Sequence, residues 1–259
     1  VAVLDQAGEL KLLRQADAVI AIQNVEAAEI ARLLPDRQVF VAPLAARVVA
    51  EPQAGDRRTL LFVGSNTAPN VIGLQWFFQA VWPQIITSIP DVELLLAGTV
   101  ASTGVAGDIP NVKVLGLVPD LDPLYARAGV VISPLTVGSG LKIKLIEALG
   151  QGKAIVATRV TTEGCDGQVV QSIFECDDAC DFANAVIRLL SNDALRLNKA
   201  CEALAVARRL YAPEACYGDL LKFADGSANP RRAWAGSASA HLDRHTPSPA
   251  LAAQARYGR

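Results

Sequence analysis

The sequence predicts an α/β protein with a doubly wound parallel sheet, on the strength of three observations. Short runs rich in valine, isoleucine and leucine recur from residue 60 onward and are apolar on both faces. Segments with helical periodicity separate these runs, as expected when crossover helices join parallel strands. Glycines follow several of the runs, at the strand ends where such sheets bind ligands. These glycines are Gly64, Gly98, Gly116, Gly138 and Gly140.

The amino-terminal part of the chain predicts two helices and two strands. Residues 9–16 and 25–34 have helical patterns, and residues 18–22 and 39–42 have the composition of short strands. A unit of this size is too small to fold alone. Residues 47–58 carry proline and glycine among charged residues, which predicts a linker.

The alternation of strands and helices is regular from residue 59 to residue 225. The predicted strands are 60–63, 93–97, 112–115, 130–133, 154–157 and 173–175. The predicted helices are 70–88, 121–128, one that begins near Leu141, 178–190, 193–210 and 213–223. The composition then changes to Ser, Ala, Pro, Gly and Arg without apolar periodicity, which predicts a disordered tail over residues 226–259.

Composition excludes several classes of protein. The chain has 259 residues, of which 51% are apolar, and a net charge of −2. Because there is no basic field, we do not expect nucleic acid as a partner. No uncharged apolar run approaches the length of about 18 residues that a membrane-spanning helix needs. The sequence begins on Val1 and contains no methionine, so we expect it to be truncated, with an upstream targeting segment left open.

The five cysteines have no CxxC spacing, which favours reduced thiols in a cytoplasmic protein; peripheral attachment to the inner face of a membrane remains open. Cys176 and Cys180 could be neighbours on one helix, but no histidine lies near them, so we expect no metal site. His241 and His245 both fall in the predicted tail. We therefore do not expect a histidine general base in the folded part.

Residues 137–149 carry the strongest local signal for a binding site. Gly138 and Gly140 allow a sharp turn after a buried strand, and a helix follows. The free N–H groups and the dipole at the start of a helix attract anions, and Lys142 adds a positive charge there. This pattern indicates a phosphate-binding loop. The alternative is an ordinary strand-to-helix turn in which Lys142 extends its amine to solvent.

Four segments then show a resemblance to a known family. They are LLFVGSNTAPNVIGLQWF from Leu60, DVELLLAG from Asp91, NVKVLGLVPDLDPLYARAGVVISPL from Asn111 and GSGLKIKLIEALGQGKAIVATRVTTEG from Gly138. Together they cover about 105 residues and resemble the retaining, nucleotide-sugar-dependent glycosyltransferases of the GT-B fold, family 4.

The resemblance implies a domain organisation. Residues 59–225 are similar to the Rossmann-like, carboxy-terminal half of a GT-B enzyme, which binds the nucleotide sugar. Residues 1–46 are similar to the last elements of the amino-terminal, acceptor-binding half. We therefore expect a donor-binding domain that is preceded by the remnant of an acceptor domain.

The resemblance also implies site residues. Glu147 occupies the second position of the family's E-x7-E motif, which holds the ribose hydroxyls; the alternative is a solvated partner of Lys144. Ser139 replaces the first glutamate, so the identity of the sugar is open. Ser65 and Asn70 replace an arginine and a lysine that normally balance the diphosphate, so either Lys142 and the helix start do so or transfer is weak.

The remaining implied contacts are weaker. The backbone at residues 117–119 lies where the family holds the nucleobase, and Glu163 is either a contact near the sugar or phosphate or a residue that caps a loop. The implied catalytic residues are Lys142 and Glu147. The implied binding residues are Gly64, Ser65, Val118, Gly138, Ser139, Gly140, Leu141, Lys142, Ile143, Glu147 and Glu163.

The function implied is transfer of a sugar, with retention, from a nucleotide diphosphate sugar to a glycan, lipid or small-molecule acceptor, without a cofactor or metal. The alternative is a catalytically degenerate fragment that binds nucleotide or acts as a scaffold. An epimerase of similar fold would need further acid and base residues, which we do not find. We expect the 259-residue chain to bind nucleotide without catalysing transfer, because catalysis in this architecture needs a cleft between two domains.

Overall fold

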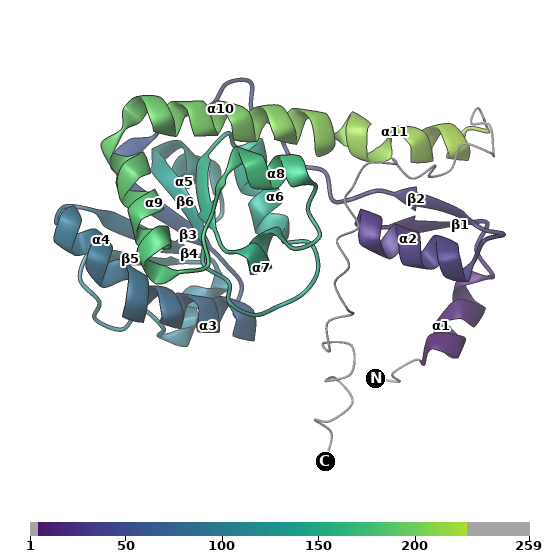
Figure 1. The fold of residues 1–259 in the computed structure, drawn as a ribbon, viewed down its shortest axis with the longest axis horizontal. Helices are drawn as coiled ribbons and strands as arrows, with labels where there is room; N and C mark the ends of the chain where they lie inside the picture. Colours follow the sequence, from purple (N-terminus) through teal and green to yellow (C-terminus); the bar gives the residue numbers. More distant parts are fainter. Residues whose placement is uncertain (1–4, 227–259) are drawn as a thin grey trace, which may run out of the picture.

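In the computed structural model, residues 5–226 are described, and within them six strands form one parallel sheet (Figure 1). The strands are β3 (Asp56–Val63), β4 (Glu93–Ala97), β5 (Val112–Gly116), β6 (Ala128–Ser133), β7 (Ala154–Ala157) and β8 (Phe174–Glu175). Their spatial order is β5-β4-β3-β6-β7-β8, and every neighbouring pair is parallel. The chain therefore winds outward from β3 in one direction and from β6 in the other. The predicted doubly wound parallel sheet is confirmed.

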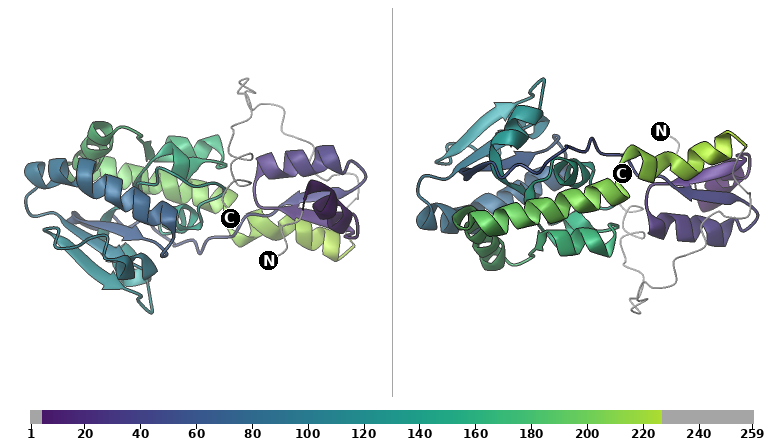
Figure 2. Two further views of the ribbon diagram at one scale, coloured as in Figure 1. Left: turned by 90° about the horizontal axis from the view of Figure 1, so that it is seen from below. Right: turned by 90° about the horizontal axis from the view of Figure 1, so that it is seen from above.

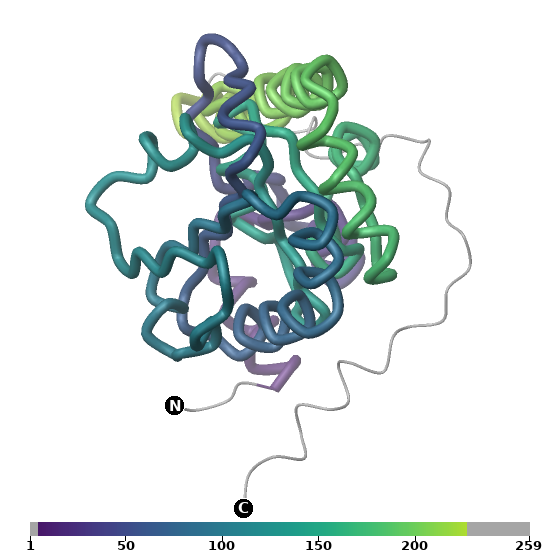
Figure 3. Tube along the Cα trace, turned by 90° about the vertical axis from the view of Figure 1, so that its left-hand side faces the viewer, coloured from purple at the N-terminus to yellow at the C-terminus, as the bar shows by residue number. Residues whose placement is uncertain are grey.

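Helices cover both faces of this sheet. Successive residues of a strand point to opposite faces, and those of β3 are apolar on both, so each face packs against helices. On one face, Leu60 and Phe62 of β3 pack against α3 (Ala68–Trp76), α4 (Trp82–Ser88) and α9 (Ala179–Ser191). On the other face, Leu61 and Val63 pack against α6 (Ile143–Gly150) and α10 (Asp193–Leu210). Figure 3 views this domain from the left-hand side of Figure 1, with the green coils of α9 and α10 at its border.

The amino-terminal part forms a smaller unit. It contains α1 (Gln6–Leu13), β1 (Ala18–Ala21), α2 (Asn24–Leu33) and β2 (Gln38–Val41), and within the described chain β1 and β2 form a parallel pair. The last described helix, α11 (Pro213–Ala224), returns to this unit and places the rings of Phe40 and Phe223 5.2 Å apart. Helices α10 and α11 run end to end along one side of both parts (Figures 1 and 2).

The segment that connects the two parts is fixed along the larger domain. The amide of Ala46 donates to the carbonyl of Tyr211 at 2.8 Å. Farther on, the buried Lys153 Nζ donates to the carbonyl of Gln53 at 2.6 Å, and Arg196 Nε donates to that of Ala54 at 3.0 Å. These bonds order a segment without regular secondary structure. Strand β3 begins at Asp56, so the last residues of the predicted linker belong to the sheet.

The helix predicted over residues 70–88 is interrupted. Between α3 and α4 lies a π-helical turn at Phe77–Val81, in which the amide of Trp82 donates to the carbonyl of Phe77. Pro83 follows directly. It has no N–H to donate, and its ring excludes the carbonyl four residues earlier, so the helix widens before it.

Three short helices within the described residues were not predicted. A 3-10 helix at Thr99–Thr103 and the helices α7 (Arg159–Thr162) and α8 (Gly167–Ser172) are too short to show periodicity in the sequence. The short helix α5 (Asp122–Arg127) agrees with the prediction. Cys176 and Cys180 do not share a helix, because α9 begins at Ala179.

Among residues 5–226, no helix is both long enough and apolar enough to cross a membrane. The predicted tail, apart from Gly226, lies outside the described residues, as do His241 and His245.

Candidate functional site

The winding of the sheet reverses between β3 and β6, and the loops that follow these two strands form the candidate site. In open α/β sheets, ligands bind beyond the carboxyl ends of the strands at such a switch point. A cavity of about 270 Å³ lies at this edge. It is lined by Val63, Gly64, Ser65, Gly98, Thr99, Leu117, Val118, Leu121 and Lys144. The structure thus brings together the predicted Gly64, Ser65 and Val118, and it adds Lys144.

Close backbone approach at the ends of β3 and β4 explains the glycines there. Gly98 has φ = +95°, and a Cβ atom at this position would lie 2.2 Å from the carbonyl oxygen of Gly64. Only glycine avoids that contact. The two loops are also joined by the amide of Asn66, which donates to Thr99 Oγ1 at 2.8 Å.

Asn70 has a structural part in the loop after β3. Its Nδ2 donates to the carbonyl of Ser65 at 2.8 Å and lies 3.1 Å from Thr67 Oγ1. The side-chain amide of Asn70 therefore closes the loop. This is the position at which the family that the sequence resembles has a lysine. Neither Ser65 nor Asn70 supplies a positive charge to the cavity.

The bend after β6 has the conformation that its glycines predict. Gly138 has φ = +127° and Gly140 has φ = +75°. Helix α6 begins at Ile143, two residues later than predicted, and Lys142 is its N-cap. No side chain within the described chain caps this helix start, and a lysine has no acceptor atom with which to do so. The N–H groups of Ile143 and Lys144 are therefore left available, whereas that of Leu145 donates to the carbonyl of Lys142 at 3.0 Å.

Lys142 folds back over the bend. Its Nζ donates to the carbonyl of Gly140 at 2.6 Å, and its Cε passes close to Gly138. Partial burial lowers the pKa of Lys142, against the opposing effect of the nearby Glu163 carboxylate. Lys142 is thus a half-buried cation beside the helix start, whereas Lys144 lines the 270 Å³ cavity.

Lys144 and Glu147 form an ion pair on the first turn of α6. Lys144 Nζ lies 2.7 Å from Glu147 Oε2, and the two side chains are 48% and 28% exposed. This is the contact that the sequence offered as the alternative to ribose binding. Glu147 itself does not line the cavity, and it reaches its edge through Lys144.

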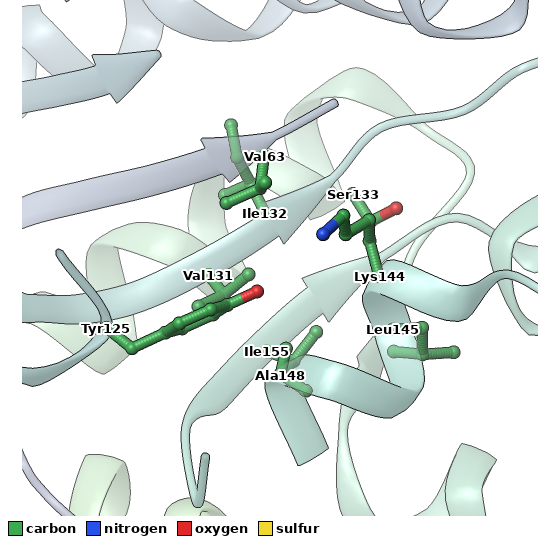
Figure 4. Close-up of a pocket in the computed structure, with 9 residues that line it drawn as sticks. All are labelled: Val63, Tyr125, Val131, Ile132, Ser133, Lys144, Leu145, Ala148 and Ile155. Atoms are coloured by element: carbon green, nitrogen blue, oxygen red, sulfur yellow. The ribbon is translucent and has the colours of Figure 1, made fainter. Parts of the chain in front are cut away.

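A smaller cavity of about 20 Å³, lined in part by Lys144, lies between the sheet and α6 (Figure 4). It is lined by Val63, Tyr125, Val131, Ile132, Ser133, Lys144, Leu145, Ala148 and Ile155. The hydroxyl of Tyr125 and the amine of Lys144 point toward the same space in Figure 4. Sequence reasoning did not single out Tyr125.

The other predicted residues lie around the bend without lining the 270 Å³ cavity. Ser139, Ile143 and Glu163 are exposed. Leu141 is half-buried and lines a separate cavity of about 170 Å³, which also contacts Gln23 of the amino-terminal unit. This second cavity lies between the two parts of the chain.

Two buried threonines hold the segment that leads into the bend. Thr158 Oγ1 donates to the carbonyl of Leu135, and Thr161 Oγ1 donates to that of Ser133 at 2.8 Å. Both side chains are almost fully buried. Sequence reasoning missed them, because hydroxyls that follow a strand give no periodic signal. Over residues 5–226, no three His, Cys, Asp or Glu side chains are grouped so that they could hold a metal ion.

A doubly wound sheet with an uncapped helix start and a cavity at its switch point is an arrangement in which α/β proteins bind ligands. The sequence model described as glycosyl transferases group 1 matches residues 57–192. The chain belongs to this family of glycosyltransferases.

Curated relatives match over the same region. The phosphatidyl-myo-inositol mannosyltransferase of Mycolicibacterium smegmatis is 31% identical over 177 residues, which cover 64% of this chain and 44% of the relative. That of Mycobacterium tuberculosis strain H37Rv is 32% identical, with coverages of 64% and 46%. An uncharacterized protein in the cps region of Klebsiella pneumoniae is 24% identical, with coverages of 63% and 45%. The chain spans somewhat less than half the length of these relatives.

Solved structures show the same GT-B fold. TarM of S. aureus, solved with UDP, superposes with a TM-score of 0.67 at 15% identity, over 87% of this chain and 48% of TarM. Sucrose-phosphate synthase from Thermosynechococcus elongatus gives 0.65 at 21% identity, over 86% and 62%. HepE of Anabaena, solved in complex with UDP, gives 0.64 at 14% identity, over 85% and 67%.

Proposed function

We propose that this chain carries the donor-binding half of a retaining family 4 glycosyltransferase, which moves a sugar from a nucleotide diphosphate sugar to an acceptor. One observation carries the proposal. The start of α6 has no capping side chain, is preceded by Lys142, and lies at the same sheet edge as a 270 Å³ cavity that Lys144 lines. Free amides, the helix dipole and two lysines at one place favour a diphosphate.

The charge of the leaving diphosphate is balanced in this proposal by the start of α6. Ser65 and Asn70 are neutral, and Asn70 is engaged in closing its loop. The positive groups left beside the bend are the amides of the first helical turn, Lys142 and Lys144. They stabilise the negative charge that develops when the glycosidic bond breaks, without a metal ion.

The nucleoside is assigned to the remaining part of the cavity. Leu117 is 79% exposed and, together with Val118, offers an apolar surface to a base. Glu147 would accept hydrogen bonds from the ribose hydroxyls. TarM and HepE were solved with UDP, and curated relatives are named mannosyltransferases. Both facts support a nucleotide-bound sugar as the donor.

The acceptor is a glycan, a lipid or a small molecule, and its site is assigned to the side that faces the amino-terminal unit. The cavity of about 170 Å³ between Leu141 and Gln23 supports this direction of approach. Because the described cysteines are free, we propose a reducing, cytoplasmic location, with peripheral attachment to a membrane as an extension of it.

Calorimetry on the 259-residue chain tests the donor site. We expect UDP or GDP, and their sugar conjugates, to bind with dissociation constants below about 1 mM. Lys142→Ala should weaken the diphosphate more than the corresponding nucleoside. Lys11→Ala, which removes an exposed lysine of α1, is the control. If none of these nucleotides binds at millimolar concentration, the proposal is wrong.

Retention and turnover need the intact gene product. Proton NMR of the product would show whether the new glycosidic bond keeps the anomeric configuration of the donor. A non-catalytic, scaffolding role is the alternative, since Ser139 stands where the family that the sequence resembles has a glutamate that contacts the sugar. The curated relatives of this chain are named as transferases, which favours sugar transfer. Robust turnover by the intact gene product would exclude a purely scaffolding role.

A further inference from the structure

A buried hydroxyl next to the candidate site has no partner. Tyr125 is 1% exposed, and its Oη makes no well-formed hydrogen bond with any residue in the described chain, although the carboxylate of Glu147 lies nearby. A buried hydroxyl without a partner costs free energy, so its retention calls for an explanation. The Tyr125 ring itself packs in the core between the sheet and α6.

The surroundings of this hydroxyl point to α6. The cavity of about 20 Å³ at Tyr125 is closed on one side by Lys144, Leu145 and Ala148, which lie on the first turns of that helix (Figure 4). The cavity is large enough for one water molecule. Burial raises the pKa of Tyr125, and the nearby carboxylate of Glu147 raises it further. The carboxylate is thus the charged group that acts on the hydroxyl.

Glu147 forms an ion pair with Lys144, and a ligand would compete for that lysine. Lys144 holds Glu147 at 2.7 Å and also lines the 270 Å³ cavity. A diphosphate in that cavity would attract the Lys144 amine, because charge-assisted contacts to phosphate are strong. Once Lys144 turns to the phosphate, Glu147 needs another group to fix its direction.

We propose that Tyr125 is a positioning residue, whose buried hydroxyl donates to Glu147 and aims the carboxylate at the ribose when the donor's phosphates draw Lys144 away. This inference rests on the proposed function. Donation to a carboxylate is the hydrogen bond that an unpaired phenol makes most favourably. The rigid ring, fixed by packing, gives that bond one direction.

The test compares two ligands and two variants of the 259-residue chain. Calorimetry measures the binding of UDP and of 2′,3′-dideoxyuridine diphosphate, which lacks the hydroxyls that Glu147 would hold. GDP and its dideoxy form are used if the protein prefers guanine. Tyr125→Phe removes the hydroxyl alone. Tyr211→Phe is the matched control, since Tyr211 is 4% exposed and its hydroxyl contacts Cys165.

We expect Tyr125→Phe to weaken the binding of UDP by roughly tenfold and to leave the binding of the dideoxy ligand nearly unchanged. Tyr211→Phe should leave the binding of both ligands unchanged. In a Glu147→Ala background, Tyr125→Phe should have no further effect on UDP. Equal weakening of both ligands, or no weakening, would overturn the role of Tyr125 alone. Failure of the unmodified chain to bind any nucleotide would overturn the proposed function instead, so the two failures are distinct.

Discussion

Lys144 and Glu147, one helical turn apart at the start of α6, form an ion pair of 2.7 Å at the edge of the candidate donor cavity. The pair joins the Lys144 amine and the Glu147 carboxylate, for which we propose different roles in donor binding. In the proposed complex, Lys144 offers a charge to the diphosphate, and Glu147 offers oxygens to the ribose. Exposed pairs of this spacing stabilise a helix by only about 0.3–0.5 kcal/mol. The pair therefore contributes little to the stability of the fold.

Glu147→Gln should separate these two roles. We expect the dissociation constant for UDP or GDP to rise about tenfold, because the amide accepts the ribose hydroxyls less strongly than the carboxylate does. Urea unfolding should change by less than about 0.5 kcal/mol. Glu202→Gln is the control, since Lys199 and Glu202 form the same pair at 2.7 Å on α10. Equal effects of the two variants on nucleotide binding would contradict the role of Glu147.

Gly98→Ala should be strongly destabilising. The substitution combines φ = +95° with a Cβ atom 2.2 Å from the Gly64 carbonyl oxygen, so we expect a loss of about 3 kcal/mol or more in urea unfolding. Gly104 has φ = +71° but open space around the added atom, so Gly104→Ala should cost only about 1 kcal/mol. If both variants cost the same, close backbone approach is not what fixes Gly98.

Thr158→Val tests the support of the bend. The change keeps the shape of the side chain but removes the donor to the Leu135 carbonyl, so we expect a loss of about 1–3 kcal/mol and weaker binding of nucleoside diphosphates. Thr87→Val is the control, since that hydroxyl bonds within an exposed helical turn. An affinity equal to that of the unmodified chain would mean that the bend keeps its shape without Thr158.

Lys153 should make stability depend on pH. Burial lowers its pKa to about 8 in the folded protein, from an ordinary value of 10.5. Between these two values the unfolded chain binds more protons, so the free energy of unfolding gains a term that rises with pH. Below about pH 8 both states are protonated and the term is constant.

Urea unfolding of Lys153→Met and the unmodified chain at pH 7, 8, 9 and 10 measures this term. The stability of the unmodified chain relative to the variant should rise by about 1 kcal/mol or more from pH 8 to pH 10. A constant difference over that range would show that Lys153 keeps an ordinary pKa.

The sheet was predictable because its strands are buried on both faces and separated by periodic helices. Residues 93–97 and 154–157 were predicted with the bounds that the structure has. The first half of β3 was missed, because Asp56 and the residues after it are polar. The π-helical turn before Pro83 was missed because its side chains continue a helical pattern.

The location of the candidate site was predictable from the sequence, but most of the side chains that line it were not. Glycines marked the loops at the switch point, but the direction of a lysine near a helix start depends on packing around it. Lys142 folds over the bend, and it is Lys144 that lines the cavity. The unpaired hydroxyl of Tyr125 becomes visible only when residues distant in sequence are brought together.

We propose that a diphosphate docks on the free amides at the start of α6. Amide NMR of the 259-residue chain, titrated with UDP or GDP and with the matching nucleoside, measures this docking at the residues concerned. We expect the amides of Ile143 and Lys144 to shift strongly with the diphosphate and little with the nucleoside. Diphosphate binding that leaves both amides unchanged would contradict it.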